Sequence, residues 1–150
     1  MSAITLRQAT VQDLPQLVPL FDAYRRFYGQ ASDTARGRDF LFERLSRHES
    51  TVLLALDKQG SALGFAQIYP TYSSVRCKHA WILNDLYVVA AERGRGVATE
   101  LINHAIQMAR AHGVDFITLE TAAANHQARQ LYERLGFVRE TEFLSYTFRT

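Results

Sequence analysis

The sequence predicts a mixed α/β domain in which a mostly antiparallel sheet is flanked by helices. The expected elements follow the order β-α-α-β-β-β-α-β-α-β. Strands joined by short turns dominate the first half, and a strand–helix–strand crossover lies in the middle, which is typical of a mixed rather than a purely parallel sheet. The chain of 150 residues has the size of one ordinary domain, so residues 1–150 are expected to form a single domain.

The N-terminal elements are expected to be a short strand and two helices. Residues 4–8 alternate between apolar and polar side chains, as in a strand with one buried face. Residues 10–13 have the spacing of a capping box, and apolar residues then recur at helical spacing. Pro19 lies inside this first helix, where it is expected to produce a kink. The second helix is expected over residues 33–48.

Three strands with turn signals between them follow. Residues 51–56 form a continuous apolar run that ends at a hairpin turn over residues 57–60. Residues 62–72 are rich in aromatic and β-branched side chains, which favour a strand. Residues 80–89 are typical of a buried central strand.

The C-terminal part is expected to alternate helices and strands. Residues 96–112 predict a helix with one apolar face, and residues 116–120 predict a strand. Residues 125–135 predict another helix, and residues 143–148 a final strand. A short additional strand is considered at residues 137–139.

Composition and charge exclude several classes of protein. The formal net charge of +2 is too small for a nucleic-acid-binding surface, which needs clustered lysine and arginine. No apolar run approaches the roughly 20 residues that span a bilayer. The first residues lack the basic stretch and apolar core of a secretory signal. The sequence therefore predicts an intracellular, cytoplasmic protein whose partners are neither membranes nor nucleic acids.

A glycine-rich segment between a predicted strand and a predicted helix has the character of an anion-binding loop. Helix N-termini present unpaired backbone N–H groups and a partial positive charge. Glycine lets a backbone approach a phosphate closely, and the two arginines are expected to add charge at the mouth of the loop. The segment and the first residues of the helix are Arg93, Gly94, Arg95, Gly96, Val97, Ala98 and Thr99.

Three readings of this loop compete on the residues alone. A nucleoside-triphosphate loop needs a lysine after the glycines, and none is present. A dinucleotide-binding loop needs a third glycine where Thr99 stands, and the acidic residue expected later, Asp115, begins a strand instead of ending one. A tight glycine turn that binds nothing is the third reading.

A second segment places three side chains on one face of a helix. Asn125, Ala128 and Tyr132 are spaced at i, i+3 and i+7. Asn125 can hydrogen-bond an amide-bearing ligand near the helix start, Ala128 leaves room for a chain to pass, and Tyr132 supplies a phenol. A packed core aromatic is the alternative role for Tyr132.

Together these two segments resemble the GNAT superfamily of N-acetyltransferases. The loop fits the pattern Arg/Gln-x-x-Gly-x-Gly/Ala, and residues 125–137 fit Asn-x-x-Ala-x-x-x-Tyr-x-x-x-Gly-Phe. The closest resemblance is to the small branch that acetylates polyamines, histones or amino acids. It implies a mixed, mostly antiparallel sheet of about six or seven strands with a splayed middle pair, flanked by four helices.

The resemblance also implies acetyl-CoA as co-substrate, with no metal. Its pyrophosphate is expected on residues 93–99, and its pantetheine arm along the strand edge at Leu86 and Val88, with Asn125 and Ala128 nearby. The implied reaction is direct transfer of an acyl group to a primary amine of a small molecule or peptide, in a ternary complex. A non-catalytic acyl-CoA sensor and, less favoured, a nucleotide-dependent oxidoreductase are the alternatives.

The proton transfers are assigned only in part. An aliphatic ammonium has a pKa near 10 and must lose a proton before attack. By resemblance, Tyr132 matches the general acid of the family. Spermidine/spermine acetyltransferases carry a glutamate where this chain has Asn84, so the base stays open between Asp85, Glu120, His79 and a water chain. In a regular strand Asp85 would point to the face opposite Asn84.

Four tyrosines are candidates for flanking a cationic amine through cation–π contacts. Packing at the edge of the core is the alternative role for each of them. They are Tyr24, Tyr28, Tyr69 and Tyr72. Residues 24–28 also resemble small yeast-type acetyltransferases, which form oligomers, often through C-terminal strands, and this is consistent with a homodimer.

Overall fold

A computed structural model describes residues 3–150 and divides them into two compact units, residues 3–119 and residues 120–150. The first unit holds the whole sheet and three helices. Its elements are β1 (Thr5–Gln8), a 3-10 turn (Val11–Asp13), α1 (Leu14–Phe27), α2 (Thr34–Ser46), β2 (Thr51–Leu56), β3 (Ala62–Ser73), β4 (Lys78–Val88), a 3-10 turn (Ala90–Glu92), α3 (Val97–Ala111) and β5 (Phe116–Thr118). The second unit contains one helix, α4 (His126–Arg134).

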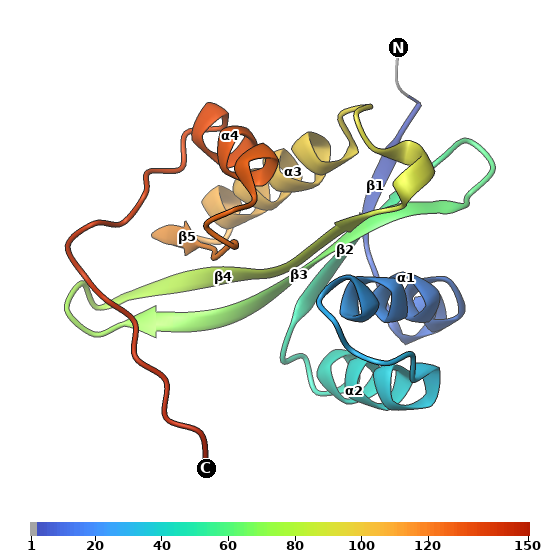
Figure 1. Cartoon of the computed structure of the whole chain (residues 1–150), viewed down its shortest axis with the longest axis horizontal. Helices are drawn as coiled ribbons and strands as arrows, with labels where there is room; N and C mark the ends of the chain where they lie inside the picture. The colour runs from blue at the N-terminus through green and yellow to red at the C-terminus, as the bar shows by residue number, and fades with distance from the viewer. Residues whose placement is uncertain (1–2) are drawn as a thin grey trace. The chain divides into compact units, whose positions relative to one another are not determined.

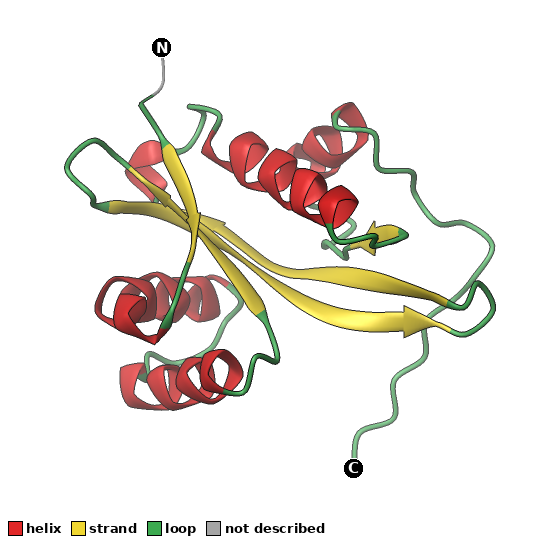
Figure 2. Cartoon of the chain, turned by 180° about the vertical axis from the view of Figure 1, so that it is seen from behind, coloured by secondary structure: helices red, strands yellow, loops and turns green. Residues whose placement is uncertain are grey.

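The five strands form one sheet in the order β1-β2-β3-β4-β5. The first four strands pair antiparallel, and β5 pairs parallel to β4 after the crossover through α3. Helices α1 and α2 lie on one face of the sheet and α3 lies on the other (Figure 1). Figure 2 shows the long β3–β4 hairpin extending beyond the shorter strands. The predicted fold class, a mixed and mostly antiparallel sheet flanked by helices, is confirmed.

Apolar side chains on both faces of the sheet explain the three-layer arrangement of the first unit. On one face, fully buried residues of α1, α2, β2 and β3 form a common cluster that includes Leu17, Leu41, Leu54 and Phe65. On the other face, α3 buries Val97, Leu101, Ile102 and Ala105. Burying a side chain of leucine size stabilises the fold by about 1.5–3 kcal/mol, so this apolar stripe holds α3 and its N-terminal turn against the sheet.

The local signals in the sequence predict most element boundaries. The capping box forms as expected, because Thr10 accepts from the Gln12 amide and the Asp13 carboxylate accepts from the Thr10 amide at 2.7 Å. Helix α1 continues through Pro19. Strand β2 covers the predicted residues 51–56, and the other described strands and helices lie within a few residues of their expected ends.

The two C-terminal strands expected from the sequence are absent from the described chain. Residues 137–139 and 143–148 have no regular structure, so the sheet has five strands instead of six or seven. Phe143, Leu144, Tyr146 and Phe148 are 76–89 % exposed. An alternating apolar pattern favours a strand, but a strand also needs a neighbouring edge to pair its N–H and C=O groups. The sequence pattern thus indicates that this segment favours a strand, but it does not indicate whether another strand edge is available to pair with it.

Candidate active site

The outer edge of β4 is available along its second half. Strand β5 pairs with β4 only at Ala80–Ile82, so β4 continues past its neighbour from Leu83 to Val88. The Val89 amide donates to the Leu63 carbonyl of β3 at 2.9 Å. Because backbone groups alternate along a strand, those of Leu86 and Val88 face away from β3. Within the described residues, no strand pairs with this edge of β4 beyond Ile82. The splayed strand pair that the resemblance implies stays a prediction.

A turn built on two left-handed glycines connects this edge to α3. Gly94 and Gly96 have φ angles of 78° and 83°, a backbone region that other residues adopt only at a cost. A Cβ at either position would meet no atom within 4 Å, so the backbone conformation alone requires glycine here. The first helical bond recorded here runs from the Glu100 amide to the Gly96 carbonyl. The amides of residues 97–99 therefore point out of the helix, which suits an anion.

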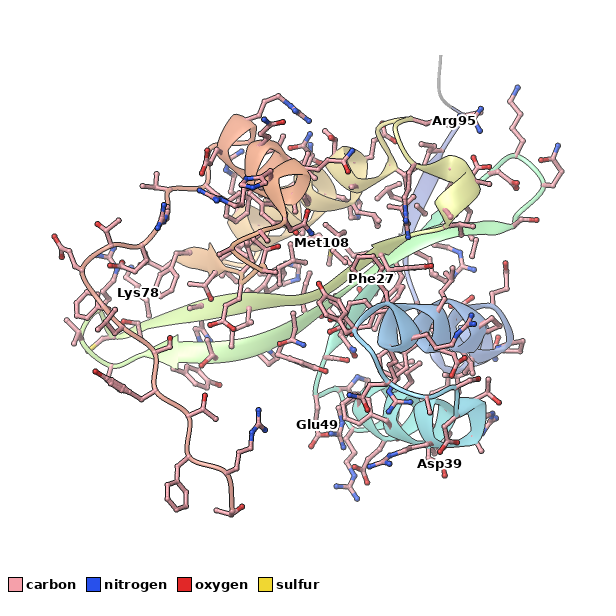
Figure 3. The ribbon with its side chains drawn as sticks, in the orientation of Figure 1. Phe27, Asp39, Glu49, Lys78, Arg95 and Met108 are labelled. Atoms are coloured by element: carbon pink, nitrogen blue, oxygen red, sulfur yellow. The ribbon has the colours of Figure 1, made fainter. Side chains whose placement is uncertain are left out.

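Each arginine of the turn has a partner within the chain, and the Arg95 side chain stays 66 % exposed at the surface. The charge that the sequence predicts at the mouth of the loop stays a prediction. Arg95 forms an ion pair with Glu92 at 2.7 Å, three residues earlier. Figure 3 shows Arg95 on the turn between β4 and α3. Arg93 folds back onto the strand, where its Nε donates to the Val88 carbonyl at 3.0 Å. The sequence could not reveal these partners, because neither contact follows from the motif.

Aromatic rings hold the folded-back Arg93 in place. Its guanidinium carbon lies 5.8 Å from the ring centroid of Phe27 and 5.3 Å from that of Tyr87. Phe27 is the last residue of α1, and its side chain is 59 % exposed (Figure 3). Cation–π contacts at such exposed positions contribute about 0.5–1 kcal/mol each. The end of α1 is thereby linked to the end of β4.

A β-bulge in β4 changes the directions of the Asn84 and Asp85 side chains. Gln67 pairs with Asp85, but the next residue of β3, Ile68, pairs with Leu83, so Asn84 is the extra residue. A bulge breaks the regular alternation of faces. Asn84 and Asp85 therefore do not simply point apart, and the Asn84 amide nitrogen donates to Asp85 Oδ1 at 2.8 Å. The expectation based on a regular strand was wrong at this position.

Asp85 is a buried carboxylate with polar partners on both oxygens. It is 2 % exposed and accepts from Gln67 Nε2 at 2.6 Å in addition to Asn84. Burial raises the pKa of Asp85, while the hydrogen bonds from Asn84, Gln67 and Tyr24 oppose that increase. A carboxylate with a raised pKa in an otherwise apolar layer is suited to accept a proton.

Three of the four candidate tyrosines gather on the α1 face of the sheet. The Tyr24 hydroxyl donates to the Asn84 carbonyl at 3.3 Å, and its ring meets that of Tyr28 edge-on at 5.1 Å between centroids. Burial and the neighbouring Asp85 raise the pKa of Tyr24, and the same causes raise the pKa of Tyr69 to about 12. Both phenols therefore stay protonated at neutral pH, close to the Asp85 carboxylate.

Tyr72 and His79 lie elsewhere. They pair with one another near the tip of the β3–β4 hairpin, with ring centroids 4.9 Å apart, and Tyr72 is 71 % exposed. His79 precedes Asp85 by six residues along β4, which corresponds to about 20 Å of strand. The structure does not bring either residue to the Asp85 cluster, by which we mean Asp85 and the side chains that surround it, Tyr24, Gln67, Asn84 and, through Gln67, Ser50.

In the second unit, the residues of the 125–137 motif have structural roles at the two ends of α4. Asn125 caps α4, because its Oδ1 accepts from the Ala128 amide at 3.2 Å, so this oxygen is engaged by the helix itself. Gly136, with a φ of 100°, ends the helix, and the Phe137 amide returns to the Tyr132 carbonyl at 3.0 Å. The Phe137 ring then meets the Tyr132 ring edge-on at 6.1 Å. The Gly-Phe pair thus places the Phe137 ring against the Tyr132 side chain.

Other candidate residues contribute through position or backbone. Glu120 follows the end of β5 by two residues and is exposed. The Val97 side chain is buried beneath α3, so only its backbone faces the turn. Ser50 and Gln67, which the sequence analysis did not single out, belong to the Asp85 cluster. For Gln67, the sequence did contain an indication of a special role, because it is a polar residue within an otherwise apolar stretch of β3.

No membrane-spanning or metal-binding feature occurs in residues 3–150. None of the helices there combines the length and apolar character needed to cross a bilayer. The same residues contain no group of three or more histidine, cysteine or acidic side chains arranged to hold a metal ion.

Comparison with known proteins identifies the class. The sequence model of the acetyltransferase (GNAT) family matches residues 17–137. The chain is 43 % identical over 143 residues to the uncharacterized N-acetyltransferase YhfO of Bacillus subtilis, covering 95 % of each. It is 28 % identical over 137 residues to the L-methionine sulfoximine/L-methionine sulfone acetyltransferase of Pseudomonas aeruginosa, covering 89 % of this chain and 79 % of that one. A crystal structure of a probable acetyltransferase has a TM-score of 0.93 and 43 % identity, with 97 % of both chains covered.

The mixed sheet with its open β4 edge and glycine turn is thus that of an acyltransferase. The chain belongs to the GNAT family of acetyltransferases. The resemblance inferred from the two sequence motifs is confirmed at the level of the family.

Proposed function

We propose that this protein is an acetyl-CoA-dependent N-acetyltransferase that acts on a primary amine, by direct attack in a ternary complex. The observation that carries the proposal is the continuity of the open β4 edge with the glycine turn and the N-terminus of α3. This continuous surface offers backbone hydrogen-bonding groups to an extended amide chain and then exposed amides to a diphosphate. The family match from residue 17 to 137 spans both units, in line with one acetyltransferase domain over residues 1–150.

The donors on this surface fit the chemistry of coenzyme A. Leu86 and Val88 would pair with the amides of the pantetheine arm, and the amides of residues 97–99 would hold the pyrophosphate. Arg93 would have to exchange its bond to the Val88 carbonyl if that oxygen accepts from the arm. Asn125 and Ala128 are retained as contacts by their match to the family motif. When bound, the thioester supplies the acetyl group.

We assign the role of general base to Asp85. The acceptor ammonium must lose a proton before its nitrogen can form the new N–C bond as the C–S bond breaks. Because Asp85 is 2 % exposed, the proton would reach it through the Tyr24 hydroxyl or one bound water. Glu120 is the competing base, and the matched variants Asp85→Asn and Glu120→Gln separate the two. Tyr132, by its match to the family motif, would donate a proton to the departing thiolate.

The acceptor is a small or flexible amine, such as an amino acid, a polyamine or a peptide N-terminus. Tyr24, Tyr28 and Tyr69 line the α1 face near Asp85, and their rings suit the flank of a cation. Tyr72 lies near the hairpin tip and would contact only an extended acceptor. The similarity to an enzyme named for two methionine derivatives supports testing amino acids first.

An acceptor screen tests this function directly. The full chain is incubated with acetyl-CoA and a panel of amino acids, polyamines and peptides, and the released thiol is measured. Turnover with at least one primary amine is expected. Normal CoA binding without turnover on any amine would indicate a sensor instead, and preference for a nicotinamide cofactor over CoA would refute the proposal.

We also propose that the protein forms a homodimer. The exposed apolar side chains of residues 143–148 support this, because an unpaired alternating segment can pair with a second copy of the chain. Light scattering coupled to size-exclusion chromatography measures the mass in solution. A monomer at micromolar concentration would contradict the proposal.

A further inference from the structure

Three polar side chains, from the loop before β2 and from strands β3 and β4, are connected by two successive hydrogen bonds that end at Asp85. The Ser50 hydroxyl, just before β2, donates to Gln67 Oε1 at 2.9 Å. Gln67 Nε2, on β3, donates to Asp85 Oδ2 at 2.6 Å. Gln67 is 0 % exposed and pairs directly with Asp85 across the strands, at the last position before the bulge.

A fully buried glutamine in the middle of a sheet needs a reason. Taking an amide out of water without a partner is unfavourable, and an apolar residue would pack at this position without that cost. Here both ends of the Gln67 amide are engaged, its oxygen by Ser50 and its nitrogen by Asp85. Because an ionised carboxylate only accepts, a flipped amide would lose its bond to Asp85 and place its oxygen against the carboxylate. The Ser50 hydroxyl then donates to the Gln67 oxygen that remains.

The surroundings of Asp85 offer no fixed positive charge to stabilise its ionised form. In the described residues, the titratable groups that act on Asp85 are the phenols of Tyr24 from α1 and Tyr69 from β3. Arg44 of α2 acts on Tyr69, and no cation is among the groups that act on Asp85. The stabilisation of the carboxylate therefore depends on neutral donors, of which Gln67 makes the shortest contact recorded.

We propose that Ser50 and Gln67 are positioning residues that hold the Asp85 carboxylate ionised and fix the position of its Oδ2. Ser50 holds the Gln67 amide in place through its oxygen, and the Gln67 amide nitrogen holds Oδ2 of Asp85. The pair thus sets the pH at which Asp85 becomes a base. This proposal rests on the proposed function only in so far as Asp85 is that base.

The direct test is the titration of the Asp85 carboxyl carbon by NMR in the full chain, with Asp85→Asn to assign the signal. In Gln67→Leu the carboxylate loses one donor, and the pKa of Asp85 is expected to rise by about 1–2 pH units. Ser50→Ala frees the Gln67 amide and is expected to raise it by less than about one unit. Ser50→Thr keeps the hydroxyl and is expected to restore the wild-type value.

A matched control separates this effect from the loss of any glutamine bond. Gln16→Leu removes a hydrogen bond to the Ala62 amide, which is 2.9 Å long and outside the cluster, and the pKa of Asp85 is expected to stay unchanged. If Gln67→Leu fails to fold, the Ser50→Ala and Ser50→Thr pair still decides the question. An unchanged Asp85 pKa in both Gln67→Leu and Ser50→Ala would overturn the proposal.

The pH profile of kcat/KM then distinguishes the positioning role of Ser50 and Gln67 from the role of Asp85 as general base. The acid limb is expected to move together with the NMR value of Asp85 in each variant. If the NMR value moves and the acid limb does not, the positioning role stands and the assignment of Asp85 as base is wrong.

Discussion

Replacing Gly96 by alanine separates the energetic role of the glycine turn from its role in binding. The φ of 83° puts the new side chain in the left-handed region, which costs a non-glycine residue about 1–2 kcal/mol. No atom lies within 4 Å of the added Cβ, so no steric term is added. For a chain of this size, the melting temperature is expected to fall by about 2–4 °C per kcal/mol. Relief of the strain would also turn the amides of residues 97–99 away from a bound diphosphate.

Gly60 provides a matched control for this experiment. It lies in the β2–β3 turn with a φ of 82° and equally open surroundings, so Gly60→Ala carries the same backbone cost outside the glycine turn that precedes α3. Both variants are expected to lose similar stability in urea denaturation. Only Gly96→Ala is expected to bind CoA more weakly, by at least about tenfold in calorimetry, since it misplaces one or more charge-assisted hydrogen bonds. Equal CoA affinity in the two variants would refute the proposed role of the turn.

Further variants test the remaining assignments. Asp85→Asn is expected to lower kcat/KM by about 10²–10⁴ with CoA affinity retained, whereas a similar loss in Glu120→Gln alone would move the base to Glu120. Tyr132→Phe is expected to slow acyl transfer with little change in CoA binding; equal losses in both measurements would make Tyr132 structural. Gly64→Ala is expected to destabilise the fold by about 1–3 kcal/mol in urea melts, because its Cβ would lie 2.7 Å from the Tyr87 carbonyl oxygen; unchanged stability would show that β3 and β4 can separate freely.

The pH dependence of stability follows from the same buried carboxylate. Burial raises the pKa of Asp85 above its ordinary value of about 3.9, so the folded chain binds this proton more tightly than the unfolded chain. The resulting stabilisation is fully present below that ordinary value and is lost as the pH rises through the raised one. The free energy of unfolding of the wild type, relative to Asp85→Asn, is therefore expected to fall over this interval. A difference that is flat with pH in paired urea titrations would contradict the raised pKa.

The exposed C-terminal segment has the sequence pattern of a strand but forms no strand within the described chain. Leu144, Tyr146 and Phe148 alternate with polar residues as in a strand, yet no edge within the described chain pairs with residues 143–148. The variant Phe143→Ser with Phe148→Ser keeps the chain length and lowers the apolar area that pairing would bury. It is expected to be monomeric in light scattering, and a persistent dimer would place the interface elsewhere.

The sequence by itself determined the features that depend on neighbours along the chain. Capping residues, glycine turns and helical periodicity act over a few residues, which is why the Thr10 cap, the glycine turn before α3 and the approximate bounds of the helices were predictable. The two motifs likewise identified the family, because each one is contiguous. The class of reaction was therefore available before the fold.

Only the tertiary structure decided what depends on contacts between distant residues. The bulge at Asn84 arises from how β3 and β4 pair, and it brings Asn84 and Asp85 together where a regular strand would separate them. Gln67 reaches Asp85 from 18 residues away, and Arg93 leaves the turn for the Val88 carbonyl because Phe27 and Tyr87 provide rings to pack against. Register, burial and side-chain partners follow from packing in three dimensions, and no spacing along the chain specifies them.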